Sequence, residues 1–222
     1  MSKVVTFLYV WKKSDEFELE NSIKLARKNY PNCRIVLVGD EPKTKVDLYI
    51  PHRQVGKCKA KKTSSSILHA AKQLDNFVLM TDDTFLNSGF NFTNAYHRGQ
   101  LVADNNLGNY NLNIINTIKF LEYYDKPLYN FECHQPFMFD SDKLLTLFNT
   151  IDIEHHHLMK SIYCNYYNLE DGFKPNLKTN NVKDAAKHYE NNRCFSTTDD
   201  ITRDMKNFIV SLTAECPPPP AE

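Results

Sequence analysis

The chain carries the stretch Asn76-Phe77-Val78-Leu79-Met80-Thr81-Asp82-Asp83-Thr84-Phe85-Leu86, in which an apolar run of strand length ends in two adjacent carboxylates. The end of a buried strand is rigid, so a group that these carboxylates bind is held in a fixed geometry. Carboxylate oxygens are the ligands that Mg²⁺ and Mn²⁺ prefer, and these ions often bind substrate phosphates as well. The alternative interpretation is a strand followed by an Asp-rich turn, because Asp is a common turn former.

The composition is that of an ordinary globular protein. The 222 residues suit one domain, with or without a small appendage, and the hydrophobic content of 41% supplies a full core. The 27 basic residues balance the 27 acidic ones, so the net charge gives no indication of a nucleic-acid binder, although it leaves room for a local basic patch. Only six glycines are present, which argues against long glycine-rich phosphate loops.

The cysteines and the N-terminus indicate the cellular compartment. None of the six cysteines stands in a Cys-x-x-Cys pair, which argues against a zinc ribbon, and their wide spacing is typical of free thiols in a reducing compartment. The first residues contain no signal-peptide core, and no window approaches the roughly 20 apolar residues that span a membrane. We therefore expect a soluble protein of the cytoplasm.

Strand and helix patterns alternate over the first 85 residues. Runs of β-branched and aromatic residues predict buried strands, and apolar residues at helical spacing predict helices. The expected order is strand 4–11, helix 17–30, strand 34–40, strand 46–50, a helix from 63 or 64 to 74, and strand 77–80. This alternation predicts an α/β fold with a mainly parallel central sheet flanked by helices.

The second half of the chain is less regular and more helical. We expect a long loop over 88–113, a helix over 114–124, one or two strands within 128–139, and further helices over 141–149, 154–168, 182–191 and 199–212. The four prolines at 217–220 predict a stiff, disordered tail.

Polar or aromatic residues follow three of the predicted strands at their carboxyl ends: Trp11, Asp40 and the pair Asp82-Asp83. In mainly parallel sheets, ligands bind at the carboxyl ends of the strands. A divalent ion held there can bridge the two phosphates of a nucleotide diphosphate and neutralise them for departure. The convergence of these residues favours a metal site over a simple turn.

A second candidate segment is Phe131-Glu132-Cys133-His134-Gln135-Pro136-Phe137-Met138-Phe139-Asp140. Glu132 and His134 alternate with apolar neighbours in a strand-like pattern, so we expect both to project into one cleft. His134 is then a general base, a metal ligand or an acceptor-binding group, and the alternative is a hydrogen-bonded structural histidine. Cys133 as a nucleophile is the weaker hypothesis, since nothing nearby predicts a lowered thiol pKa.

Two charged runs complete the set of candidates. Lys57-Cys58-Lys59-Ala60-Lys61-Lys62 precedes a predicted helix N-terminus and is suited to phosphate, either of a nucleotide sugar or of a nucleic-acid backbone, unless it is a solvated surface run. Glu154-His155-His156-His157 lies in a predicted helix, where three consecutive side chains point in three directions. At most one of these histidines reaches any single site.

The order of these pieces resembles the GT-A class of nucleotide-sugar glycosyltransferases. The acidic motif of that class is usually Asp-x-Asp, whereas this chain has Thr81-Asp82-Asp83. The segment His134-x-Pro136 resembles the acceptor side of Stealth-type sugar-phosphate transferases, which carry an Asn-Asp-Asp strand end and a Trp-Val-Asp-Gly-like opening where this chain has Tyr9-Val10-Trp11-Lys12. The chain also looks like small glycosyltransferases of bacteriophages, some of which modify hydroxymethylated DNA bases. The resemblance covers roughly residues 4–165.

The resemblance implies a role for each candidate residue. It implies a site for Mn²⁺ or Mg²⁺ at Asp82 and Asp83. It places the nucleotide of the donor, most simply a UDP-sugar, among four residues: Trp11, Asp40, Lys59 and Lys62. It implies that three residues face the acceptor: His134, Glu132 and Asp140. It implies one GT-A-like domain over 1–213, with a nucleotide-binding half at 1–87 and an acceptor half at 88–213, followed by the tail at 214–222.

Three functions are compatible with these motifs and their order. The first is a metal-dependent glycosyltransferase that moves a sugar to a hydroxyl acceptor, such as a hydroxymethylated base in phage DNA. The second is a Stealth-like transferase of sugar 1-phosphate, which releases a nucleoside monophosphate instead of a diphosphate. The third is a non-catalytic nucleotide- or DNA-binding module whose acidic pair is a turn. The sugar, the stereochemical outcome and the oligomeric state stay open.

Overall fold

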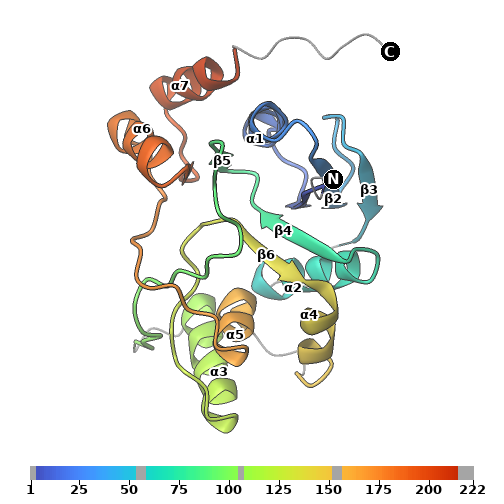
Figure 1. The fold of residues 1–222 in the computed structure, drawn as a ribbon, viewed down its shortest axis with the longest axis vertical. Helices are drawn as coiled ribbons and strands as arrows, with labels where there is room; N and C mark the ends of the chain where they lie inside the picture. The colour runs from blue at the N-terminus through green and yellow to red at the C-terminus, as the bar shows by residue number, and fades with distance from the viewer. Residues whose placement is uncertain (1–3, 54–58, 105–107, 152–156, 215–222) are drawn as a thin grey trace.

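The computed structural model describes residues 4–53, 59–104, 108–151 and 157–214, and its centre is a five-stranded sheet in the order β3-β2-β1-β4-β6 (Figure 1). Four strands are parallel: β1 (Thr6–Trp11), β2 (Arg34–Gly39), β3 (Leu48–Pro51) and β4 (Asn76–Met80). The edge strand β6 (Phe137–Asp140) runs antiparallel to β4. The expected α/β fold with a mainly parallel sheet is confirmed.

Helices cover both faces of this sheet (Figure 1). The helix α1 (Phe17–Asn29) packs with Phe7, Tyr9 and Trp11 of β1 on one face. The helices α2 (Lys59–Ala71) and α4 (Ser141–Phe148) pack with Leu8 on the other. Successive side chains of a strand point to opposite faces, so β1 contributes to two separate apolar layers.

A small second sheet joins the end of β4 to the C-terminal part of the chain. It pairs β5 (Thr84–Leu86) with β7 (Cys194–Ser196) in antiparallel register, and the rings of Phe85 and Phe195 stack at 5.0 Å. Two further helices, α6 (Val182–Asn191) and α7 (Arg203–Thr213), pack around it, and α7 also packs on α1. The sequence did not predict these strands, because three residues are too few for a period-two pattern.

The segment expected to form strands within 128–139 joins the sheet only from Phe137, so that prediction is wrong for 128–136, where Tyr129 makes a single isolated bridge to Gln100. The loop takes its hydrogen bonds from side chains of α5 (Met159–Tyr166) and from the backbone of residues 98–101. The Asn165 side chain accepts from the Tyr129 amide at 3.0 Å, and Ser161 accepts from the Phe131 amide at 3.0 Å. Alternating burial therefore arises here without a sheet.

Several helix boundaries differ from those expected. The helix α2 begins at Lys59, inside the lysine run, and not at residue 63 or 64. The helix α3 (Asn109–Tyr123) starts within the segment expected to be a loop. The helix α5 begins at Met159, and residues 154–156 of the histidine run lie outside the described residues, as does the tail at 215–222.

The structure bears on two further expectations, one about the cysteines and one about membrane-spanning helices. Four of the six cysteines are among the described residues, and all four are free thiols: Cys33, Cys133, Cys164 and Cys194. Within the described ranges, none of the helices has the length and apolar character that a membrane crossing requires.

Candidate functional site

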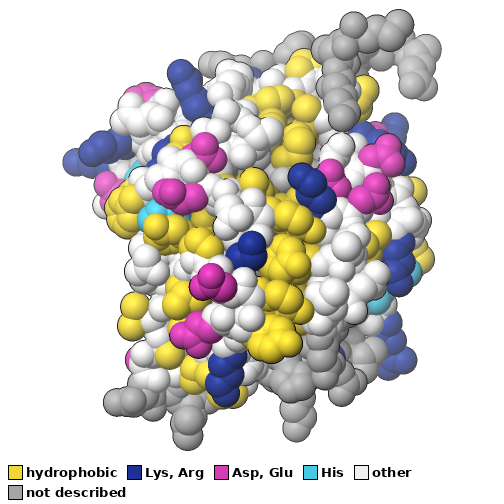
Figure 2. All heavy atoms as spheres, turned by 60° about the horizontal axis from the view of Figure 1, so that its bottom comes forward, with side chains coloured by type: hydrophobic (Ala, Val, Ile, Leu, Met, Phe, Trp, Pro, Cys, Tyr) yellow, Lys and Arg dark blue, Asp and Glu magenta, His cyan; other side chains and the backbone are white. Residues whose placement is uncertain are grey.

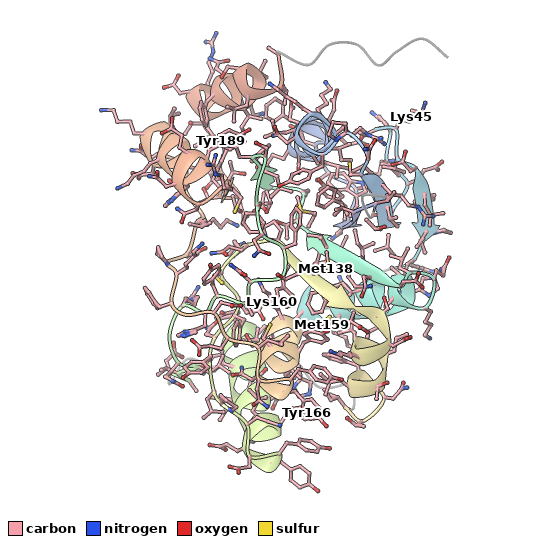
Figure 3. The ribbon with its side chains drawn as sticks, in the orientation of Figure 1. Lys45, Met138, Met159, Lys160, Tyr166 and Tyr189 are labelled. Atoms are coloured by element: carbon pink, nitrogen blue, oxygen red, sulfur yellow. The ribbon has the colours of Figure 1, made fainter. Side chains whose placement is uncertain are left out.

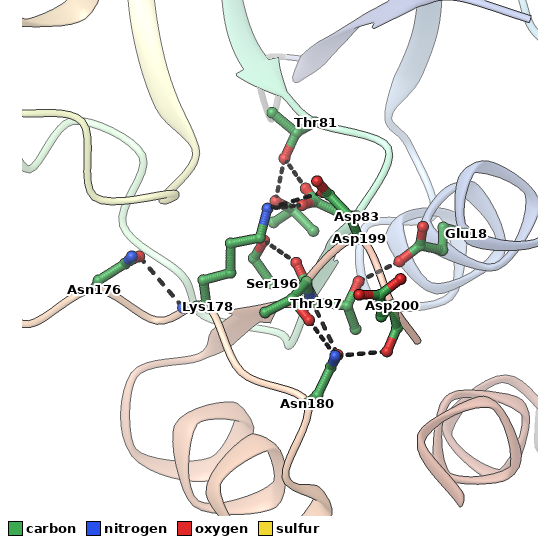
Figure 4. A network of polar contacts seen from close by, with 12 residues as sticks. Glu18, Thr81, Asp83, Asn176, Lys178, Asn180, Ser196, Thr197, Asp199 and Asp200 are labelled. Atoms are coloured by element: carbon green, nitrogen blue, oxygen red, sulfur yellow. Dashed lines mark hydrogen bonds and ion pairs between the residues drawn. The ribbon is translucent and has the colours of Figure 1, made fainter. Parts of the chain in front are cut away.

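The pair Asp82-Asp83 lies in the turn between β4 and β5, at the carboxyl edge of the main sheet (Figure 4). The Thr84 amide donates to the Thr81 carbonyl at 3.1 Å, and the Thr81 hydroxyl donates to Asp83 Oδ1 at 2.5 Å. The Thr197 amide, just after β7, donates to the Asp83 carbonyl at 3.0 Å. The acidic pair is therefore part of a turn, and that turn is held rigidly by both sheets.

The turn also lies where the strand order of the main sheet changes direction. The strands β1, β2 and β3 follow one another toward one side, whereas β4 returns to the other side of β1. The carboxyl ends of strands at such a switch point are the usual ligand-binding position of open α/β sheets. The fold thus places Asp82 and Asp83 at the edge where a bound ligand is expected.

A lysine that the sequence patterns did not single out contacts this pair. The Nζ atom of Lys178 lies 3.4 Å from Asp83 Oδ2 and 3.6 Å from Asp199 Oδ1 (Figure 4). The backbone of Lys178 is anchored by a parallel bridge to Ser196, and the Thr179 amide donates to the Ser196 carbonyl at 2.8 Å. Only the pairing through β7 brings this lysine to the turn, so no local pattern predicts it.

Negative charge accumulates around the turn. Glu18, in the first turn of α1, accepts a hydrogen bond from the Thr197 hydroxyl. Burial raises the pKa of Glu18, and the carboxylates of Asp83 and Asp82 raise it further, which places all three acids near one another. A local excess of carboxylates attracts a cation.

The donor set of the turn fits Mg²⁺ or Mn²⁺ only in part. The described residues contain no cluster of three or more His, Cys, Asp or Glu side chains that holds a metal ion by itself. Mg²⁺ is, however, commonly bound by one or two carboxylates together with substrate phosphates. The oxygens of Asp82 and Asp83 fit that kind of shared site, in which the substrate completes the coordination.

His134 lies in the loop before β6 and faces the same region. Its backbone is left-handed, with φ of 48°, which is uncommon for a residue with a side chain. Burial lowers the pKa of His134, and Asp83 acts in the opposite direction. The negative charge of Asp83 favours the protonated imidazole, whereas burial, the larger cause, favours the neutral one.

Lys160, in α5, donates a hydrogen bond to this loop. Although only 8% of its surface is exposed, its Nζ donates to the Gln135 carbonyl at 3.0 Å and lies 5.4 Å from the centre of the Phe137 ring. It projects from the start of α5, near the centre of the molecule (Figure 3). The hydrogen bond fixes the Gln135–Pro136 peptide, one residue beyond His134. The sequence did not single out Lys160, because its neighbours along the chain gave no sign that it is buried.

Two of the predicted acceptor-side acids make structural hydrogen bonds. Glu132 accepts from the Ser161 amide at 3.1 Å and from the Ser161 hydroxyl at 3.0 Å, so it secures the loop to α5. Asp140 pairs with Asn76, at the start of β4, and caps α4 by accepting from the Lys143 amide at 2.9 Å. Asp140 therefore lies at the opposite edge of the sheet from the acidic pair, because β6 is antiparallel.

The residues expected around the nucleotide differ in their position and in their exposure. Trp11 is at the carboxyl end of β1, but it is only 1% exposed and packs in the core, so its ring is not open to a base. Asp40 follows β2 at the same edge and accepts from the Lys13 amide at 2.9 Å. Lys59 and Lys62 lie in the first turn of α2, which follows the carboxyl end of β3, whereas residues 57 and 58 are outside the described residues.

Cys133 is not arranged as a nucleophile. Burial raises the pKa of its thiol, which disfavours the reactive thiolate. The Sγ atom donates to the Tyr96 carbonyl at 2.9 Å. This thiol is a buried part of the loop.

Comparisons with known proteins give a fold but no sequence family. No protein-family model matches the chain, and no curated protein matches its sequence. Two solved structures resemble it over nearly its whole length. The bifunctional glycosyltransferase WbbM, in its apo form, matches with a TM-score of 0.52 and 9% identity over 98% of this chain and 50% of that one. The galactosyltransferase LgtC, in complex with donor and acceptor sugar analogs, matches with a TM-score of 0.52 and 9% identity over 97% and 98%.

This chain has a glycosyltransferase fold. It spans half the length of WbbM and nearly the full length of LgtC. The GT-A-like architecture expected from the order of the sequence motifs is confirmed by this likeness, which at 9% identity concerns the fold alone.

Proposed function

We propose that this protein is a metal-dependent glycosyltransferase, which moves a sugar from a nucleotide-sugar donor, most simply a UDP-sugar, to a hydroxyl acceptor. The observation that carries the proposal is the acidic pair Asp82-Asp83 at the switch point of a glycosyltransferase fold. The LgtC structure, which has this fold, holds donor and acceptor sugar analogs.

In this reaction the bond between the anomeric carbon and the phosphate oxygen breaks, and a bond from that carbon to the acceptor oxygen forms. The nucleoside diphosphate leaves with the bonding electron pair, and the acceptor hydroxyl loses its proton. Mn²⁺ or Mg²⁺, when bound, supplies positive charge that neutralises the leaving diphosphate. Asp82 and Asp83 would hold this ion, and Lys178 would add a further positive charge beside them.

His134 is the candidate that accepts the proton. Because burial lowers the pKa of His134, its imidazole is neutral at pH 7 and has a nitrogen able to accept a hydrogen bond from the acceptor hydroxyl. Lys160 fixes the neighbouring peptide and thereby keeps the imidazole in place. Lys59 and Lys62, at the start of α2, are the proposed phosphate contacts, and Asp40 is the proposed nucleoside contact.

The first experiment is a thermal-shift screen of nucleotide sugars with and without Mn²⁺. Stabilisation by one donor only in the presence of Mn²⁺ is the expected result, since a ligand that binds the folded state raises the unfolding temperature. Asp83→Asn should lose this shift. The absence of a metal-linked shift with every donor would contradict the proposal.

A second measurement identifies the released nucleotide. Release of a nucleoside diphosphate supports sugar transfer, whereas release of a monophosphate indicates transfer of sugar 1-phosphate. Donor binding that persists in Asp83→Asn without metal, and without turnover in either protein, indicates a non-catalytic binding module.

The acceptor proposed from the phage resemblance is a hydroxymethylated base in DNA. On the face drawn in Figure 2, Lys and Arg side chains are interspersed with Asp and Glu instead of forming a basic stripe. The Lys57–Lys62 run is the proposed contact for DNA phosphates. Transfer of labelled sugar to hydroxymethylated DNA, with unmodified DNA and free glycans as parallel acceptors, tests this choice. Labelling of glycans alone would exclude DNA.

A further inference from the structure

We propose that Lys178 and the divalent metal ion compete for Asp83, so that the ammonium of Lys178 closes the metal site until the nucleotide donor arrives. This inference rests on the metal-dependent function proposed above and concerns how its site is controlled. It would make Lys178 a built-in competitor of the metal ion, in addition to its contribution of charge.

Both carboxylate oxygens of Asp83 already have partners in the acidic turn. Asp83 uses Oδ1 to accept from the Thr81 hydroxyl at 2.5 Å, and Oδ2 faces Lys178 Nζ at 3.4 Å. Both side chains are well shielded, with 17% of Asp83 and 22% of Lys178 exposed. The carboxylate oxygen that would face an incoming metal ion is therefore the one that the ammonium now faces.

A metal ion bound to Asp83 would repel the ammonium of Lys178. A divalent cation bound to Asp83 and an ammonium at 3.4 Å from the same carboxylate would lie only a few ångströms apart. Two like charges at that separation repel strongly in a region shielded from water. The metal ion and Lys178 therefore compete for Oδ2 of Asp83, and binding of one weakens the contact of the other.

The structure also provides a place for the displaced ammonium. Asp199 Oδ1 lies 3.6 Å from the same Lys178 Nζ, and 92% of the Asp199 side chain is exposed (Figure 4). The backbone of Lys178 is fixed by the bridge to Ser196, whereas its side chain is flexible and able to turn between the two carboxylates. Asp199 therefore acts as the alternative partner when the metal ion takes Asp83.

The competition makes metal and donor binding cooperative. A metal ion alone must displace the ammonium and loses the energy of the Lys178–Asp83 pair. A nucleoside diphosphate brings negative charge that compensates both cations at once. Each ligand then increases the affinity for the other, and by linkage the two increases are equal.

The decisive test is a calorimetric titration of Mn²⁺ into the protein without donor. Lys178→Met should bind Mn²⁺ about fivefold more tightly than wild type, since a partly buried ion pair of this kind contributes roughly that factor. Lys178→Arg retains the charge and should stay close to wild type. Lys206→Met removes a separate lysine–carboxylate pair, with Asp15 at 3.8 Å, and should leave the affinity unchanged.

A double-mutant cycle tests the role of Asp199. Asp199→Asn should weaken Mn²⁺ binding, and the loss should be larger in wild type than in the Lys178→Met background, because only wild type needs the alternative partner. Equal losses in both backgrounds mean that Asp199 acts through its charge alone and would overturn this part of the proposal.

The same titrations show whether the proposal fails. Unchanged or weaker Mn²⁺ affinity in Lys178→Met would overturn it, as would the absence of Mn²⁺ binding to both proteins. Addition of a nucleoside diphosphate should raise the Mn²⁺ affinity of wild type more than that of Lys178→Met, and equal increases would also overturn it. None of these measurements requires turnover, so a lack of glycosyl transfer, which would refute the proposed function, is a separate result.

Discussion

The turn that carries Asp82 and Asp83 and the loop that carries His134 form two sides of the candidate site, and they are built in different ways. The turn is closed by its own neighbours, through the hydrogen bonds of Thr81 and Thr84. The loop depends on α5, since the Phe131 amide donates to Ser161 and the Gln135 carbonyl accepts from Lys160. The first geometry is mostly local in sequence, with one added bond from the Thr197 amide, and the second arises from tertiary packing.

Asp83→Asn tests the turn side and has the largest expected effect. The substitution keeps the shape of the side chain but removes the negative charge that binds the metal ion. We expect the kcat/KM for sugar transfer to fall roughly 100-fold or more, the range seen when a main source of charge stabilisation is removed. Steady-state assays of nucleotide release measure this change.

A matched control uses an aspartate outside the site. Asp15→Asn removes an exposed carboxylate that pairs with Lys206 at 3.8 Å and accepts from the Phe17 amide. Its activity should stay at the wild-type level. A similar loss in both variants would mean that general electrostatics, and not the metal-binding turn, explains the result.

Lys160→Met tests the loop side and should have a smaller effect. The variant loses the hydrogen bond to the Gln135 carbonyl but also removes a buried charge, so we expect a change in stability of only about 1–2 kcal/mol. A small displacement of His134 should lower kcat roughly tenfold. The pKa of His134 should rise, because Lys160 lowers it in wild type. NMR titration of the His134 ring measures this rise without any assay of activity.

Lys126→Met is the control for a lysine near an aromatic ring, since Lys126 lies 5.3 Å from the centre of the Tyr166 ring. It should alter neither kcat nor the titration of His134. An unchanged pKa of His134 in Lys160→Met would show that Lys160 serves the packing of α5 alone.

The contrast between turn and loop explains what the sequence can predict. The strand before Asp82 and its place at the sheet edge follow from an apolar run and strand–helix alternation, both of which are local. Lys178 reaches Asp83 only through β7, and the buried state of Lys160 depends on the loop above it, so neither leaves a local pattern. The strand pattern around Glu132 misled for the same reason, because packing on α5 produced the alternation.

The pH dependence of activity distinguishes the two sides further. Burial lowers the pKa of His134 below its ordinary value of 6.5, so the neutral base persists to more acidic pH than a free histidine. The acidic limb of the kcat profile should therefore lie below pH 6.5. Acidification from pH 6.5 down to the lowered pKa of His134 should also destabilise the fold, because over that range the unfolded chain takes up this proton first. A limb at or above the ordinary histidine pKa, or one that persists in His134→Gln, would contradict the assignment.

The smallest effect on activity is expected for Asp140→Ala, which tests the position that antiparallel β6 gives to this residue. Asp140 caps α4 through the Lys143 amide at 2.9 Å, and loss of such a cap typically costs about 1 kcal/mol of stability. Because Asp140 pairs with Asn76 at the start of β4, it lies at the opposite edge from Asp83, and kcat/KM should not change. Chemical denaturation measures the first quantity and nucleotide release the second. A loss of activity larger than the loss of folded protein would place Asp140 in the acceptor site after all, and would mean that the acceptor reaches across the sheet to both edges.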